Sequence, residues 1–100
     1  MRTEYNLTAA IGAPTPTGNP SAYFVAADGT HHVIYRSAID LHLRELWFTC
    51  CGVTHHDLTA FGRAPIAWSD PSAYYFPSDG TQHVIYRSSD GHIHDLQWGK

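Results

Sequence analysis

The chain has 100 residues, 43% of them hydrophobic, and a formal net charge of -3 at neutral pH. This length indicates one domain with a thin core, and the charge balance excludes the basic surface that nucleic-acid binding requires. No apolar run reaches the length of a membrane span, and the N-terminal residues lack the apolar stretch of a signal peptide. We therefore expect no membrane insertion and, by default, a cytoplasmic protein, with non-classical export left open.

The strongest feature of the sequence is an internal repeat. The phrase DGTHHVIYRS at residues 28–37 returns as DGTQHVIYRS at residues 79–88. The same shift of 51 residues places LTAAIGAP (7–14) on LTAFGRAP (58–65), and beyond residue 37 the shift falls to 50. We predict one module of two units, with repeat 1 at about residues 6–56 and repeat 2 at about residues 57–98.

Each unit has the pattern of short antiparallel strands joined by tight turns. β-branched and aromatic residues alternate in the strand segments, and Asp-Gly pairs at 28–29 and 79–80 indicate hairpin turns. The strands we expect, in chain order, are residues 2–10, 21–26, 31–37, 41–48, 53–61, 72–77, 82–88 and 92–98. Segments containing proline and glycine, GAPTPTGNP and GRAPIAWSDP, link the units.

Four short strands in a repeat of about fifty residues are typical of a β-propeller blade. The chain begins with a segment equivalent to a fourth strand and ends without one. We therefore expect an all-β protein with two four-stranded blades per chain, in which residues 2–10 complete the last blade of a neighbouring chain. Two blades cannot close a ring, so a dimer, trimer or tetramer is required, and we favour the six-bladed trimer. A monomeric β-sandwich is the alternative, but it leaves the displaced strand unexplained.

The segment VIYRSSDGHIHDLQW (84–98) resembles the blade core of the fucose-binding β-propeller lectins of fungi and soil bacteria. Tyr86, Gly91, Asp95 and Trp98 carry the resemblance. The first unit matches it at Tyr35, Glu45 and Phe48, with Asp40–Leu41 in place of the Asp-Gly turn. Some members of that family are two-blade chains that trimerise into six-bladed rings. The resemblance thus implies repeated, non-catalytic sugar sites and glycans or glycoconjugates as partners.

The family's sugar-binding arginine, two residues before the tyrosine, is replaced here by Val33 and Val84. The nearby Arg36 and Arg87 follow the tyrosine and fall on the opposite strand face. The resemblance therefore implies a sugar site without specifying fucose.

The residues expected to bind carbohydrate combine carboxylates with aromatic rings, because a carboxylate accepts sugar hydroxyls and an aromatic face packs on the C–H patch of a sugar ring. They are Glu45, Asp95, Trp47, Trp98, Trp68, Tyr35 and Tyr86. Two alternatives remain open: the carboxylates could pair with Arg36 and Arg87, and the tryptophans could pack blade against blade.

Other functions fit the repeat less well. A glycosidase needs two carboxyl groups across one sugar, whereas the equivalent Glu45 and Asp95 fall in separate blades, so we expect no enzyme. The eight histidines supply no local set of three or four convergent ligands, so we expect no metal and no cofactor. A ligand-free propeller that serves as a scaffold for protein–protein interaction is the alternative function.

The two cysteines, Cys50 and Cys51, are adjacent. Consecutive Cα atoms lie closer together than those of an ordinary disulfide. We therefore expect two thiols near a turn in a reducing compartment, with soft-metal or redox chemistry as the alternative.

Overall fold

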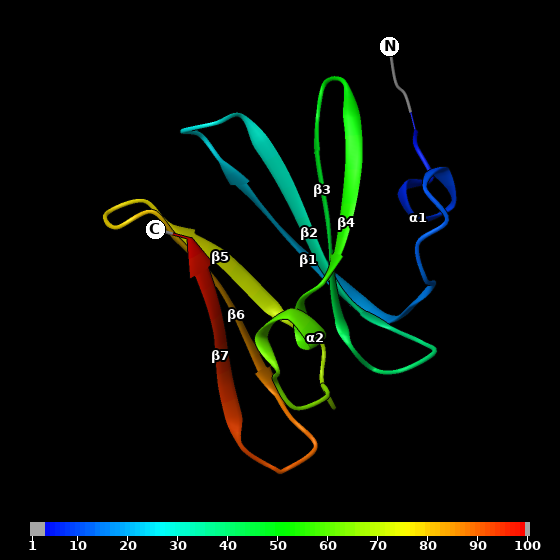
Figure 1. Ribbon diagram of the computed structural model, residues 1–100, viewed down its shortest axis with the longest axis vertical. Helices are drawn as coiled ribbons and strands as arrows, with labels where there is room; N and C mark the ends of the chain where they lie inside the picture. The colour runs from blue at the N-terminus through cyan, green and yellow to red at the C-terminus, as the bar shows by residue number, and fades with distance from the viewer. Residues whose placement is uncertain (1–3, 100) are drawn as a thin grey trace.

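The structure is a computed structural model that describes residues 4–99. Its strands form two antiparallel sheets, each with its strands in chain order, and two one-turn helices, α1 and α2, accompany them (Figure 1). The elements are α1 (Leu7–Ala10), β1 (Pro16–Val25), β2 (Thr30–Ser37), β3 (Leu43–Thr49), β4 (Gly52–Asp57), α2 (Leu58–Gly62), β5 (Ser72–Phe76), β6 (Thr81–Arg87) and β7 (Ile93–Gly99). The expected all-β class is confirmed. None of the described helices is long and apolar enough to cross a membrane.

The sheets correspond to the two predicted units. Sheet 1 contains β1 to β4, sheet 2 contains β5 to β7, and their first strands, β1 and β5, contact each other. Helix α2 lies between the sheets, whereas α1 and β7 lie on opposite sides of the molecule (Figure 1). Sheet 2 therefore has three strands where sheet 1 has four, and β7 is an open edge among the described residues.

The predicted Asp-Gly hairpins are confirmed. Gly29 and Gly80 adopt φ of 73° and 75°, a left-handed conformation that glycine takes without steric cost. The preceding aspartates fix these turns, since Asp28 accepts a bond from the Thr30 amide at 3.1 Å and Asp79 does the same for Thr81.

The second turn of each unit differs in sequence but not in backbone. Gly91 adopts φ of 83°, and its equivalent Leu41 adopts φ of 60°. Asp40 and Asp90 occupy the preceding position and accept amide bonds from His42 and His92. The first unit thus keeps the turn although its leucine disfavours it.

Two strand predictions were wrong over part of their length. The strand expected over 53–61 ends at Asp57, where α2 begins, and the strand expected over 2–10 contains α1 from Leu7 onward. Asp57 and Asn6 cap these helices by accepting bonds from the amides of Ala60 and Ala9. Residues 2 and 3 lie outside the described residues. The first predicted linker is also partly strand, because β1 begins at Pro16.

The main core lies between the sheets. Ile34 and Leu43 of sheet 1 pack against Val84 and Tyr86 of sheet 2, with Leu58 of α2 beside them. A smaller cluster covers the other face of sheet 1 and contains Ala13, Tyr35 and Leu46, with Leu7, Ile11, Val33 and Val53 packed against it. The repeat maps Leu7, Tyr35 and Leu46 onto Leu58, Tyr86 and Leu96, so the smaller cluster corresponds to one half of the main core.

Replacing Leu41 with glycine should stabilise the fold. A left-handed conformation costs a non-glycine residue about 1–2 kcal/mol, and glycine removes that cost while adding some unfolded-state entropy. We expect Leu41→Gly to raise the free energy of unfolding by about 0.5–1 kcal/mol in urea denaturation. Gly91→Ala is the reciprocal control: a Cβ there meets no atom within 4 Å, so its cost comes from the backbone alone. A destabilised Leu41→Gly protein would refute this explanation.

Candidate ligand site between the sheets

A pocket of about 380 Å³ opens between the two sheets. Its lining residues come from β3, β4, α2 and β7, and they are Glu45, His56, Asp57, Leu58, Phe61 and Trp98. The volume falls within the range of small-ligand pockets, roughly 300–1,000 Å³. The sheets thus bring together two predicted site residues, Glu45 and Trp98, that lie far apart in sequence.

Glu45 is 4% exposed and is held by a chain of hydrogen bonds. Its Oε2 lies 2.7 Å from His32 Nδ1, and His32 Nε2 lies 2.7 Å from the Thr30 hydroxyl. That hydroxyl donates to Asp28 at 2.6 Å. Among the described residues only Oε2 of Glu45 has a side-chain hydrogen-bond partner, so the fold fixes one carboxylate oxygen and the other can accept a further bond.

Sheet 2 contains an equivalent chain. Asp95 lies 3.1 Å from His83 Nδ1, His83 Nε2 lies 2.7 Å from the Thr81 hydroxyl, and Thr81 donates to Asp79. The side chain of Asp95 is 36% exposed, because no further sheet of the described chain covers it. The repeated phrase therefore encodes a turn, a threonine and a histidine that together hold a carboxylate on the next strand.

The alternative pairing of these carboxylates with arginines is wrong. Arg36 pairs instead with Asp70 at 3.5 Å, and Arg87 donates to the Trp68 carbonyl oxygen at 3.1 Å. His32 and Arg36 lie on the same sheet face as Glu45, two residues before and after its register partner Ile34. The Glu45 carboxylate bonds to His32.

Aromatic rings stack across the face of sheet 1 that is turned toward sheet 2. Tyr23, His32, Trp47 and His56 follow one another from β1 to β4, with ring centroids 4.8, 6.4 and 6.3 Å apart. Burial, and secondarily the Glu45 carboxylate, raise the pKa of Tyr23, whose hydroxyl donates to Gln82 Oε1 of sheet 2 at 2.7 Å. Trp47 is thus sandwiched between histidines, whereas the indole of Trp98 faces the pocket.

Three other predicted site residues lie away from this pocket. Tyr35 and Tyr86 are buried, and their hydroxyls donate to the carbonyl oxygens of Pro14 and Pro65 at 2.7 and 2.9 Å. Trp68 is half exposed, beside the isolated bridge that Ala67 forms with Ser88. The two tyrosine hydroxyls therefore hold the loop that precedes the first strand of each sheet.

A charged cluster beside the pocket was not predicted from the sequence. Donor atoms of Asp40, His42 and Asp57 lie within 4.8 Å of one another, a geometry that could hold a metal ion. Arg44 Nη2, however, lies 2.7 Å from Asp40 and 3.4 Å from Asp57, and His42 lies 2.8 Å from Asp57. The carboxylates are already compensated by Arg44, so the cluster is an ion-pair network. In the sequence, this cluster was indicated only by the alternate spacing of Asp40, His42 and Arg44.

Hydrogen bonding controls the ionisation of Asp40. Partial burial raises its pKa, but bonds from the Ser37 hydroxyl, the His42 amide and Arg44 outweigh this effect and lower the pKa to about 2. The fold therefore stabilises the charged form of this carboxylate.

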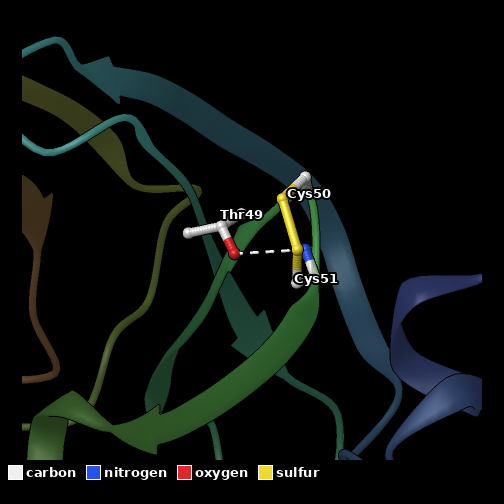
Figure 2. Close-up of a disulfide and its surroundings, with 3 residues drawn as sticks. All are labelled: Thr49, Cys50 and Cys51. Atoms are coloured by element: carbon white, nitrogen blue, oxygen red, sulfur yellow. Dashed lines mark hydrogen bonds between the residues drawn. A yellow bond between two sulfur atoms is a disulfide. The ribbon is translucent and has the colours of Figure 1, made fainter.

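The expectation of two free thiols was wrong. Cys50 and Cys51 form a disulfide at the exposed turn between β3 and β4, with their Cα atoms 3.8 Å apart (Figure 2). The Cys51 amide donates to Thr49 Oγ1 at 3.2 Å within the same turn. The usual Cα–Cα separation applies to disulfides between separate segments of a chain. Two adjacent cysteines instead close a small ring when they form a disulfide.

No protein-family model, curated protein or solved structure matches this chain. The resemblance to fucose-binding blades therefore rests on the motif residues, and the function is inferred from the geometry of the pocket.

Replacing Asp40 with asparagine should alter acid stability. Because the folded pKa of Asp40, about 2, lies below the unfolded value of about 3.9, its ionised form stabilises the fold above about pH 4, and this contribution is lost as pH falls toward 2. Urea unfolding at a series of pH values should show Asp40→Asn less stable than wild type at pH 6, with the difference shrinking below pH 4. Asp70→Asn, at a more exposed ion pair, is the control and should cost less. A constant difference down to pH 2 would contradict this role.

Proposed function

We propose that the protein is a carbohydrate-binding, lectin-like module without catalytic activity, and that its ligand occupies the pocket between the sheets. The observation that carries the proposal is the convergence of a buried carboxylate, Glu45, and an aromatic platform, Trp98, from opposite sheets. The free oxygen of Glu45 would accept sugar hydroxyls with charge assistance, and the indole would pack on the C–H face of the ring. His56, exposed at the pocket edge, offers a further polar contact.

Of the carboxyl groups in the pocket, Asp57 is poorly suited to the proton donation that a glycosidase requires. A glycosidase needs one carboxylic acid that keeps its proton, and the pocket contains two carboxyl groups, Glu45 and Asp57. Burial raises the pKa of Asp57, but bonds from the Ala60 amide and His42 and the charge of Arg44 outweigh burial and lower it. Asp57 is therefore held ionised by its cap and ion-pair partners and is poorly suited to donate a proton.

We also propose that the chains join head to tail into a closed propeller. Ile93 is 70% exposed although its equivalent Leu43 is fully buried, and Tyr74 is 44% exposed on the same face. At the opposite end of the chain lies the smaller cluster, with Tyr35 and Leu46 buried beneath Leu7; their equivalents Tyr86 and Leu96 meet sheet 1 in the main core. Sheet 2 thus has an exposed apolar face at one end of the chain. The smaller cluster of sheet 1, at the other end, is equivalent to the residues that cover such a face in the main core.

The N-terminal segment fits the open edge of sheet 2. Asn6 has φ and ψ of -90° and 93°, close to the -92° and 96° of Asp57 at the end of β4. Transferring the pairing of β3 with β4 through the repeat places Asn6 opposite His94 and Tyr5 opposite Asp95 of a second copy. The resemblance to trimeric two-blade lectins gives our choice of ring: three chains and six blades.

The sugar site can be tested on a glycan array with the intact oligomer. Trp98→Ala removes the platform and Glu45→Gln removes the charge that assists the hydrogen bonds, so each should weaken binding by about tenfold, amplified by lost avidity. Trp68→Ala is the matched control, because Trp68 is exposed away from the pocket. Equal losses in all three variants would argue against this pocket. A blank array from a folded oligomer would favour the protein-binding scaffold.

The ring can be tested with two isoleucines of similar exposure. Ile93→Asp places a charge on the face proposed to be buried and should convert the oligomer to monomer in native mass spectrometry. Ile39, 74% exposed in the β2–β3 turn, belongs to neither face, so Ile39→Asp should leave the assembly intact. Removing residues 1–6 should also weaken assembly. A wild-type chain that is monomeric at micromolar concentration would refute the ring.

A further inference from the structure

The disulfide turn between β3 and β4 is held together by contacts that do not involve sulfur. Thr49 and Gly52 are the last register pair of the two strands, so Cys50 and Cys51 alone form the turn (Figure 2). The Cys51 amide also donates to Thr49 Oγ1 at 3.2 Å. Opening the S–S bond therefore leaves the two cysteine side chains next to each other on a turn that the paired strands keep in place.

Neither packing nor backbone conformation explains cysteine at these two positions. Cysteine that serves packing is usually buried, whereas Cys50 and Cys51 are both exposed. Two-residue hairpin turns favour glycine, asparagine and aspartate, which take positive φ, but neither cysteine has positive φ. The chemistry of the paired sulfurs is therefore the property that distinguishes this turn.

The turn offers two sulfur ligands and no third ligand from nearby side chains. Within residues 4–99, the histidine, cysteine and acidic donors that gather closely enough for a metal ion are Asp40, His42 and Asp57, and this group contains neither cysteine. Zinc usually takes four ligands and is not satisfied by two. Because adjacent residues hold their sulfurs side by side, with Cα atoms 3.8 Å apart, the pair also cannot place them on opposite sides of a linear two-coordinate ion. A pyramidal centre that needs only two neighbouring sulfurs fits the turn.

We propose that the reduced Cys50–Cys51 pair is a binding site for trivalent organoarsenicals. Arsenic(III) in these compounds is pyramidal and prefers soft sulfur ligands, and its third bond is to carbon, so it needs two sulfurs and nothing else from the protein. An arsenoxide, R–As=O, reacts with both thiols: two S–As bonds form, the two thiol protons leave with the oxygen as water, and arsenic stays trivalent.

The oxidation state of the pair controls this site, because the disulfide form has no thiol to react with arsenic. A phosphine reductant attacks one sulfur, the S–S bond breaks, and with water the products are phosphine oxide and two thiols; sulfur gains the two electrons that phosphorus loses. A dithiol reductant gives the same pair by exchange and is itself oxidised to a disulfide. Arsenical binding therefore requires prior reduction and then prevents the S–S bond from forming again.

Chelation distinguishes the pair from a single reactive cysteine. Once one S–As bond has formed, reaction with the second thiol is intramolecular, and such linkage raises affinity by about 10²–10⁴-fold. Cys50→Ser and Cys51→Ser should each weaken binding by about a hundredfold or more in the presence of excess glutathione, a competing monothiol. Thr49→Val keeps both sulfurs but removes the bond to the Cys51 amide, so it should weaken binding by about three- to tenfold through lost order of the turn.

The experiment titrates the full chain with phenylarsine oxide and measures the adducts by intact-mass spectrometry. The reduced protein, freed of phosphine, should gain one phenylarsenic group per chain with loss of one water, and excess 2,3-dimercaptopropanol should remove it. The oxidised protein should gain none. Urea unfolding compares both serine variants with reduced wild type, and all three should be equally stable because the turn is exposed.

Three results would overturn the arsenical site. The first is failure of the reduced wild type to bind, and the second is binding of equal strength by either serine variant. The third is uptake of two arsenicals per chain, since each sulfur would then react alone. Binding by the oxidised protein would overturn the redox control. The pocket between the sheets contains no cysteine, so these results are independent of the proposed sugar binding.

Discussion

Apolar packing between the two sheets holds this fold together and creates its candidate site. Ile34 and Leu43 are buried because Val84 and Tyr86 cover them, and removal of this apolar surface from water stabilises both sheets. The pocket with Glu45 and Trp98 exists only because this packing sets the two sheets side by side. Stability and the candidate site therefore arise from the same contact.

The two carboxylates show what this contact contributes to electrostatics. Glu45 and Asp95 are held by the same arrangement of histidine, threonine and aspartate, so the sequence of each unit positions its own carboxylate. Their burial differs because sheet 2 covers only the first of them. A buried carboxylate interacts more strongly with a partner or ligand than an exposed one, since less water screens it. In the proposed ring the second carboxylate gains the same environment from a neighbouring chain.

Local sequence predicted much of the fold and less of the site. The Asp-Gly turns and the alternating strands were predictable because short-range sterics decide them, and the repeat by itself identifies Glu45 and Asp95 as equivalent positions. The one-turn helices were missed because their caps, Asn6 and Asp57, follow segments with strand character. Tyr35 and Tyr86 were assigned to the site by residue type, but their hydroxyls reach proline carbonyl oxygens 21 residues earlier, a contact that only the tertiary fold creates.

The two units differ at some of the positions where one sheet meets or would meet the next, although Leu7, Tyr35 and Leu46 recur unchanged as Leu58, Tyr86 and Leu96. The hydrogen-bonded phrase differs by one letter, whereas Leu43 has become Ile93, Trp98 corresponds to Phe48, and Gly99 corresponds to Thr49 beside the disulfide. The phrase forms the same turn and carboxylate hydrogen bonds in both units and also supplies core residues between the sheets, such as Ile34 and Val84, so it tolerates little change. Residues at the contact between sheets meet different neighbours in each unit, and apolar contacts accept substitution as long as volume is kept. A two-unit chain can therefore keep one scaffold while the two contacts that it forms, one internal and one between copies, acquire different chemistry.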